Sequence, residues 1–230
     1  MPNPSSWQTW QRGYSHLVWD WNGTLLNDTW ISADITNLML ADRGRPGLSI
    51  EDYRRQFGFP LEEYCRQIGF DLEAETIAQI SDCFIEKYEL RRLECDLHPS
   101  SRPLLDSLHE IGIEQMILSA YRQETLDELV LHFGLRKYIG QAVGVDNDRG
   151  EGKVGIGLAW LETAEVSPSS VLLIGDTLHD HEVAEAMEVD CILVAHGHQS
   201  TARLQSSGRE VFADFAALAR ALELPVRATD

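Results

Sequence analysis

The stretch Leu17-Val18-Trp19-Asp20-Trp21-Asn22-Gly23-Thr24-Leu25 decides the fold of this chain. Its first three residues are apolar, and a short apolar run closed by turn residues is typical of a buried parallel strand. Ligands of open α/β sheets bind just beyond the carboxyl ends of such strands. Asp20 stands at that point, where it would serve as a nucleophile or a metal ligand. The stretch alone leaves open a simpler interpretation, in which Asp20 only caps an Asx-type turn.

The later part of the chain alternates between strand-like apolar runs and helical patterns. Strands are expected over residues 115–119, 142–145, 171–174 and 191–194, and helices over 124–132, 154–164 and 182–187, with a further helix that ends at Gly112. Alternation at this spacing predicts a parallel sheet with right-handed crossovers.

A block of helical patterns separates the first strand from the others. Helices are expected over residues 28–42, 50–57, 61–68 and 74–93, and no strand-like run interrupts them. We therefore expect an α/β fold with a Rossmann-like parallel sheet core and an inserted all-helical module. The predicted core comprises residues 1–26 and 97–230, and the predicted helical cap comprises residues 27–96.

The composition narrows the class of partner. The 230 residues include 37 acidic and 19 basic side chains, for a net charge of -18, which disfavours nucleic acids and anionic membranes as partners. A small anionic ligand stays compatible, because a bound metal reverses the charge locally. Four cysteines without C-x-x-C spacing, and an N-terminus without an apolar signal region, predict a cytoplasmic protein with reduced thiols. A monomer or a homodimer is expected.

The chemistry-bearing residues follow the predicted strands. Asp20 follows the first strand, Ser119 ends the second, Lys153 begins the helix after the third, and Asp176 and Asp180 follow the fourth. Three carboxylates against one ammonium group need a counter-ion when they lie close together. A hard divalent cation with oxygen ligands, Mg²⁺ above all, supplies it.

These residues resemble the motifs of the haloacid dehalogenase (HAD) superfamily of phosphohydrolases. Asp20 to Thr24 is similar to its D-x-D-G-T motif, and Ser119 matches its Ser/Thr, with Ala120 where Asn often follows. Lys153 matches the motif lysine, and Asp176 with Asp180 matches the G-D-x-x-x-D pair. The inserted helices resemble the cap of the phosphoglycolate phosphatase and β-phosphoglucomutase group, and phosphoglycolate is therefore the expected substrate.

The resemblance implies a role for each position. Asp20 would attack phosphorus and form an aspartyl-phosphate, and Ser119 and Lys153 would hold the other phosphate oxygens. Mg²⁺ would be held by Asp20, the backbone carbonyl of Asn22 and Asp176, while Asp180 would anchor a metal-bound water or orient Lys153. Thr24 and Ala120 complete the expected substrate-binding set.

Asn22 departs from the family pattern, which has at this position an Asp that protonates the leaving oxygen and later activates water. General acid–base catalysis contributes ~10²–10⁴ in rate, and an amide cannot provide it. A phosphatase could use another acid, such as His179, or act on acyl phosphates that need none. A phosphonate hydrolase would use the cap lysine Lys87. A haloalkanoate dehalogenase would not need the retained acidic pair, and a phosphate-ligand binder without turnover is the rival from another class.

Two further groups of residues carry weaker signals. His196 and His198 in the sequence His-Gly-His are expected to be loop residues, because no third metal ligand is spaced nearby. Arg54, Arg55 and Arg66 in the cap could meet a substrate carboxylate, although ordinary solvated helix faces explain them equally well.

Overall fold

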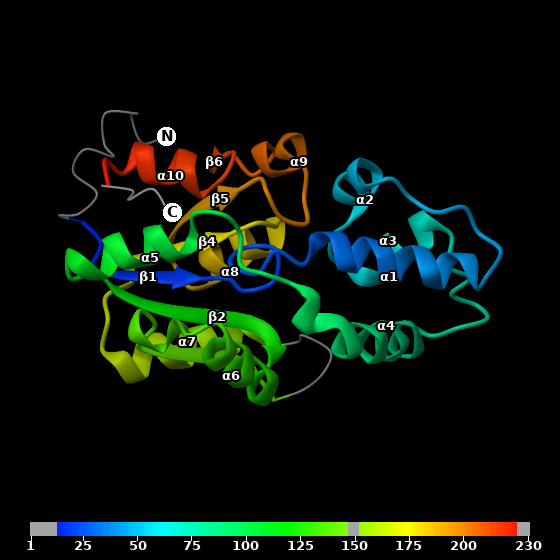
Figure 1. Ribbon diagram of the computed structural model, residues 1–230, viewed down its shortest axis with the longest axis horizontal. Helices are drawn as coiled ribbons and strands as arrows, with labels where there is room; N and C mark the ends of the chain where they lie inside the picture. The colour runs from blue at the N-terminus through cyan, green and yellow to red at the C-terminus, as the bar shows by residue number, and fades with distance from the viewer. Residues whose placement is uncertain (1–12, 147–151, 225–230) are drawn as a thin grey trace.

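The computed structural model describes residues 13–146 and 152–224. Within these ranges six strands, all paired in parallel, form one sheet in the order β3-β2-β1-β4-β5-β6 (Figure 1). The strands are β1 (His16–Trp19), β2 (Glu114–Arg122), β3 (Gln141–Val145), β4 (Val171–Gly175), β5 (Asp190–Val194) and β6 (Glu210–Phe212). The predicted parallel α/β sheet is confirmed.

Strand β1 is central and is buried on both faces. Leu17 and Trp19 belong to an apolar cluster with helices α5 (Ser101–Glu110), α6 (Gln123–His132) and α10 (Phe215–Ala221). Val18 belongs to the opposite cluster, with α7 (Lys153–Ala164), α8 (Leu178–Ala186) and α9 (Thr201–Gln205). Because helices cover both faces, the strand is a continuous apolar run instead of an alternating one. Two 3₁₀ turns, η3 (Leu135–Lys137) and η4 (Pro168–Ser170), complete this part.

Four helices between β1 and α5 lie together at one end of the molecule, beyond the sheet (Figure 1). They are α1 (Thr29–Ala41), α2 (Ile50–Gln56), α3 (Leu61–Ile68) and α4 (Ile77–Arg91), and the 3₁₀ turn η2 (Arg92–Glu94) follows the last. We call these helices the helical block. The chain enters and leaves it side by side, since the backbone N–H of Asn27 donates to Asp96 O (2.8 Å) and that of His98 donates to Leu25 O (2.9 Å). The division at residues 26 and 97 stays a prediction.

Helix α2 is fastened to the loop after β5. The Arg54 guanidinium donates to the carbonyl of His196 (2.8 Å), and the N–H of Ser200 donates to the carbonyl of Arg54 (3.0 Å). The side-chain amide of Gln199 donates to the carbonyl of Phe57 (3.1 Å). These bonds hold the helical block against the carboxyl edge of the sheet.

Some predicted boundaries were wrong. Helix α8 begins at Leu178 instead of residue 182, because Thr177 and Asp180 form a capping box at its start. Strand β2 runs past Ser119 to Arg122. Strand β6 and helices α9 and α10 were not predicted. No described helix is long and apolar enough to cross a membrane.

Candidate active site

Asp20, Asp176 and Asp180 meet at the carboxyl edge of the sheet. Strands β1 and β4 are neighbours, with Trp19 opposite Ile174, so the residues that follow them emerge together. All three carboxylates are buried, and one oxygen of each lies within 4.8 Å of the others. The three acidic residues that the sequence singled out thus lie together, in an oxygen cluster that could hold a metal ion, and their roles stay predictions.

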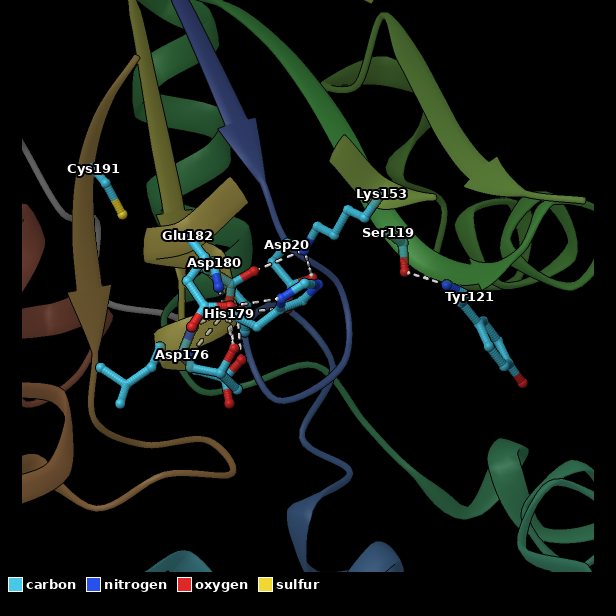
Figure 2. A network of polar contacts seen from close by, with 12 residues as sticks. Asp20, Ser119, Tyr121, Lys153, Asp176, His179, Asp180, Glu182 and Cys191 are labelled. Atoms are coloured by element: carbon cyan, nitrogen blue, oxygen red, sulfur yellow. Dashed lines mark hydrogen bonds and ion pairs between the residues drawn. The ribbon is translucent and has the colours of Figure 1, made fainter. Parts of the chain in front are cut away.

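Lys153 and Thr24 each donate hydrogen bonds to two of the three carboxylates. Lys153, at the start of α7, donates from Nζ to Asp20 Oδ1 (2.5 Å) and to Asp180 Oδ1 (2.7 Å), and Figure 2 shows its side chain reaching toward them. The Thr24 hydroxyl lies between Asp20 Oδ2 (3.0 Å) and Asp176 Oδ1 (2.9 Å) as a shared donor. The carboxylate of Asp20 is thus oriented from both sides.

The charges in the cluster do not balance. Burial and the charge of Asp180 raise the pKa of Asp20, and burial raises that of Asp176 well above its usual value. Burial opposes ionisation of Asp180 too, but the ammonium group of Lys153 keeps its pKa low, and the two carboxylates keep the pKa of Lys153 raised despite burial. A divalent cation would neutralise the two uncompensated carboxylates. The hard oxygen donors present fit such an ion.

Two glycines approach Asp176 so closely that no side chain fits. A Cβ on Gly197 would lie 2.1 Å from Asp176 Oδ2, and a Cβ on Gly23 would lie 2.3 Å from the same atom. Gly23 also has a φ of +74°, which other residues rarely adopt. The backbone therefore encloses this carboxylate on two sides.

Asn22 belongs to a hydrogen-bond network around Asp28, a residue that the sequence did not single out. The Asn22 amide donates to Asp28 Oδ2 (2.8 Å) and to the hydroxyl of Tyr88 (2.9 Å), and Tyr88 itself donates to Asp28 Oδ2 (2.7 Å). The N–H of Gly23 donates to Asp28 Oδ1 (2.7 Å). Burial works against ionisation of Asp28, but protonated His198 and these donors hold its pKa below its usual value.

His198 is a second residue that sequence reasoning missed, since the His-Gly-His stretch by itself predicts only loop structure. It is 6% exposed and lies against the acidic cluster, where its N–H donates to Asp176 Oδ2 (2.6 Å). Its ring contacts Asp28 Oδ1 (3.3 Å) and the hydroxyl of Tyr53 (3.0 Å). Burial lowers its pKa, yet Asp28 outweighs burial and raises it to about 9. The available signal was its position beyond β5, next to the strand that carries Asp176.

His196 points elsewhere. Its Nε2 lies 3.1 Å from the carbonyl of Thr24, and its ring stacks on that of His98 with centroids 3.7 Å apart. Burial lowers the pKa of His196 to about 4 and that of His98 to about 3. The two histidines of the His-Gly-His stretch are therefore held by different protein groups.

Ser119 and Ala120, which match the Ser/Thr motif, lie on β2, and β1 separates them from β4 and Asp176. Ser119 is buried near the end of β2, and its hydroxyl accepts from the N–H of Tyr121 (3.0 Å), to one side of the acidic cluster in Figure 2. Ala120 lines a cavity of about 250 Å³ that extends from Asn22 into the helical block. The phosphate-binding roles of Ser119, Ala120 and Thr24 stay predictions.

His179 lies at the edge of this site. Its ring is 4.9 Å from that of Phe59 in the cavity wall, and its Nδ1 contacts Glu182 (3.3 Å) on its own helix. The other candidates lie elsewhere, and Lys87 does not line the cavity. Arg54 holds the loop after β5, as described above. Arg55 and Arg66 pair with acidic residues on their own helices, Asp52 and Glu62.

Comparisons with known proteins agree with the sequence motifs. Residues 17–194 match the family model described as haloacid dehalogenase-like hydrolase. A phosphoglycolate phosphatase of Pseudomonas savastanoi pv. phaseolicola is 23% identical over 79% of this chain and 70% of its own length. Among solved structures, a predicted phosphatase from Clostridium acetobutylicum has a TM-score of 0.75 at 20% identity, covering 91% of this chain and 98% of its own. Protein tyrosine kinase A of Mycobacterium tuberculosis has a TM-score of 0.71 at 21% identity, covering 91% and 98%. At these identities the structures are evidence of the fold alone.

Proposed function

Because the chain belongs to the haloacid dehalogenase-like hydrolase family, we propose that it hydrolyses small phosphomonoesters with Mg²⁺ through a phosphorylated Asp20. The observation that carries this proposal is the position of the Asp20 carboxylate. It is buried at the end of β1, bonded to Lys153 and Thr24, and next to Asp176. A carboxylate that served only as a turn cap would not need these partners.

In the proposed reaction, a carboxylate oxygen of Asp20 attacks phosphorus, and the ester P–O bond breaks to release the alcohol. Lys153, which spans Asp20 and Asp180, and Ser119 hold the oxygens of the transferring phosphoryl group. Water then cleaves the aspartyl-phosphate and restores the carboxylate. Asp20, Asp176, Asp180 and the backbone carbonyl of Asn22 would hold Mg²⁺, which neutralises negative charge when bound.

The source of the proton for the leaving alcohol distinguishes the candidate functions. Both N–H groups of Asn22 are held by Asp28 and Tyr88, so residue 22 supplies no titratable group. This observation favours two alternatives to an ordinary phosphatase. One is a hydrolase of activated phosphates, whose leaving groups need no acid. The other is a protein that binds a phosphorylated ligand with little turnover. Hydrolysis of phosphonates would need Lys87 at the site.

Phosphoglycolate is the reference substrate, because the relatives named above include a phosphoglycolate phosphatase. We place the protein in the cytoplasm as a monomer or a homodimer, acting on a small metabolite and not on nucleic acid or membranes. The net charge of -18 supports this choice of partner.

The test is phosphate release from a panel of phosphomonoesters, acyl phosphates and phosphonates, measured with Mg²⁺ and with chelator. We expect Asp20→Asn to abolish release, and the peptide that contains Asp20 to carry a phosphoryl group after acid quench of the wild type. Asp82→Asn, which changes an exposed carboxylate on α4, is the matched control. Equal turnover by Asp20→Asn and the wild type would overturn the proposal.

A further inference from the structure

The cavity beside Asn22 has walls that are largely aromatic. It extends from Asn22 and Ala120, at the carboxyl edge of the sheet, into the helical block. Seven aromatic side chains from the helical block and its connecting loops line it: Tyr53, Phe57, Phe59, Tyr64, Phe70, Phe84 and Tyr88. Since Asn22 lies two residues after Asp20, a phosphoryl group held at Asp20 would direct its ester substituent into this cavity.

The wall provides no cation for an acidic substituent. No lysine or arginine is among the described residues that line the cavity. Its imidazole, His198, is already paired with Asp28. Glu89, the other carboxylate of the wall, accepts from the hydroxyl of Tyr121 and pairs with Arg92 (3.2 Å). A substituent with a free carboxylate would therefore lose its hydration without gaining a partner.

The volume of the cavity suits a ring. An engineered apolar cavity of about 150 Å³ binds benzene, and drug-sized ligands need upwards of about 300 Å³. At about 250 Å³, this cavity holds a single aromatic ring with a short linker. The Tyr64 hydroxyl is buried in its wall beside the hydroxyl of Thr36, so a polar atom on the ring of an occupant would find a hydroxyl group to bond to.

We propose that the phosphorylated compound taken by this site carries a ring-sized apolar substituent on a short linker, and not the carboxylate of phosphoglycolate. The proposal rests on the function proposed above, with Asp20 as the phosphate end of the site. In hydrolysis the P–O bond of such an ester breaks. Over the whole cycle one water molecule is consumed: its oxygen and one of its protons end on inorganic phosphate, and its other proton balances the one that the alcohol carries away.

The first test measures binding without turnover. We compare 3-phenylpropylphosphonate with propylphosphonate and 3-phosphonopropionate, by calorimetry with Mg²⁺. Burial of an aromatic group is worth ~10–100-fold, so we expect the phenyl compound to bind at least 10-fold more tightly than either of the others. Equal affinity for the phenyl and propyl compounds, or tighter binding of 3-phosphonopropionate, would overturn the proposal.

The second test measures turnover of three esters of primary alcohols, which differ little in leaving-group strength. We expect kcat/KM for 2-phenylethyl phosphate to exceed those for ethyl phosphate and phosphoglycolate by ~10–100-fold. A preference for phosphoglycolate would refute the cavity assignment and leave the hydrolase intact. Absence of all turnover, together with the binding preference, would refute hydrolysis and leave the cavity assignment intact.

Variants on α4 test whether the preference for the phenyl compound arises in this cavity. Ser81→Phe fills part of the cavity, and Phe84→Ala removes one aromatic wall. Each is expected to weaken binding of 3-phenylpropylphosphonate by about 10-fold and to leave that of propylphosphonate unchanged. Leu90→Phe, at a residue that is 83% exposed on the same helix, is the matched control. Two folded variants that bind the phenyl compound as tightly as the wild type would overturn the assignment. If Ser81→Phe does not fold, Phe84→Ala alone decides.

Discussion

The side-chain amide of Asn22 donates a hydrogen bond to the carboxylate of Asp28, 2.8 Å away. The position that holds a carboxylate in the family motif is thus an amide here, and a buried carboxylate lies directly against it. An aspartate at position 22 would place two negative charges in contact, which is unfavourable in a buried site. The identities of residues 22 and 28 therefore depend on each other.

Exchanging these two residues should restore an ordinary acid at position 22. We expect Asn22→Asp alone to gain little activity, because the new carboxylate faces Asp28. In the double variant Asn22→Asp/Asp28→Asn the amide lies at position 28 and can donate to the new carboxylate. We expect it to raise kcat for an alkyl phosphate by ~10²–10⁴ over the wild type. Steady-state kinetics of the wild type, both single variants and the double variant measure the coupling.

Equal kcat values for Asn22→Asp and the double variant would show that Asp28 does not restrain residue 22. The wild-type preparation needs a control of its own, since Asn-Gly sequences deamidate to Asp. Peptide mass spectrometry should find Asn22 intact. The structure favours this result because the N–H of Gly23, the group that attacks in deamidation, is bonded to Asp28.

Lys153→Met removes the only cation bonded to Asp20 and Asp180 among the described residues. Removal of one partner of a buried ion pair costs about 3–5 kcal/mol, and we expect a loss of this size in the free energy of unfolding without Mg²⁺. We expect kcat to fall by ~10²–10³, as for loss of a donor to a developing oxyanion. Lys87→Met is the control. An equal loss of kcat in that variant would instead favour the phosphonate hydrolase.

Metal binding should stabilise the protein by neutralising the acidic cluster. At a Mg²⁺ concentration of 100 times Kd, the expected gain is about 2.7 kcal/mol, measured by chemical denaturation with and without the ion. Asp176→Asn should remove most of this gain. Without Mg²⁺ it should be at least as stable as the wild type, because one uncompensated buried carboxylate is gone. A full Mg²⁺ response in Asp176→Asn, matching that of Asp82→Asn, would contradict the assignment of Asp176 as a ligand.

The stacked pair His98 and His196 should make the fold sensitive to acid. Their pKa values in the fold, about 3 and about 4, lie below the unfolded value of about 6.5. Below pH 6.5 the unfolded chain therefore binds more protons than the folded one. The pair's contribution to stability is complete above pH 6.5. It falls by up to about 3 kcal/mol per pH unit as the pH drops toward 4.

Urea denaturation at several pH values between 7.5 and 4.5 measures this slope. His98→Phe keeps the ring contact and removes one titrating group, so the slope should fall by about half. His109→Phe changes an exposed histidine and should leave the slope unchanged. A slope that is the same in His98→Phe and in the wild type would show that another group causes the acid sensitivity.

The confirmed parts of the sequence analysis have a common physical basis. β1, β4 and β5 are short apolar runs buried on both faces, and turn residues end them sharply. Parallel strands bring their carboxyl ends to one edge, and because β1 and β4 are neighbours in the sheet, Asp20 and Asp176 meet there. The family and the enzyme class followed from the same residues.

The missed parts depend on contacts that are distant in the chain. In the sequence Asp28 is only the first residue of a predicted helix, and its role becomes visible only where His198 lies against it, 3.3 Å away. Strand β6 has three residues, too few for a periodic signal. The predicted start of α8 is too late because the sequence analysis gives Asp180 only roles at the metal ion or at Lys153, although it also takes part in the capping box of the helix.

The loop after β5 touches both halves of the molecule. It bonds to Asp176 through His198 and to α2 through Ser200 and Gln199. An outward movement of α2 would break its bonds to this loop and pull on the segment whose N–H donates to Asp176. If the proposed hydrolysis needs α2 to move before the alcohol leaves, product release would also disturb Asp176, and the strength of these bonds would affect the rate of turnover.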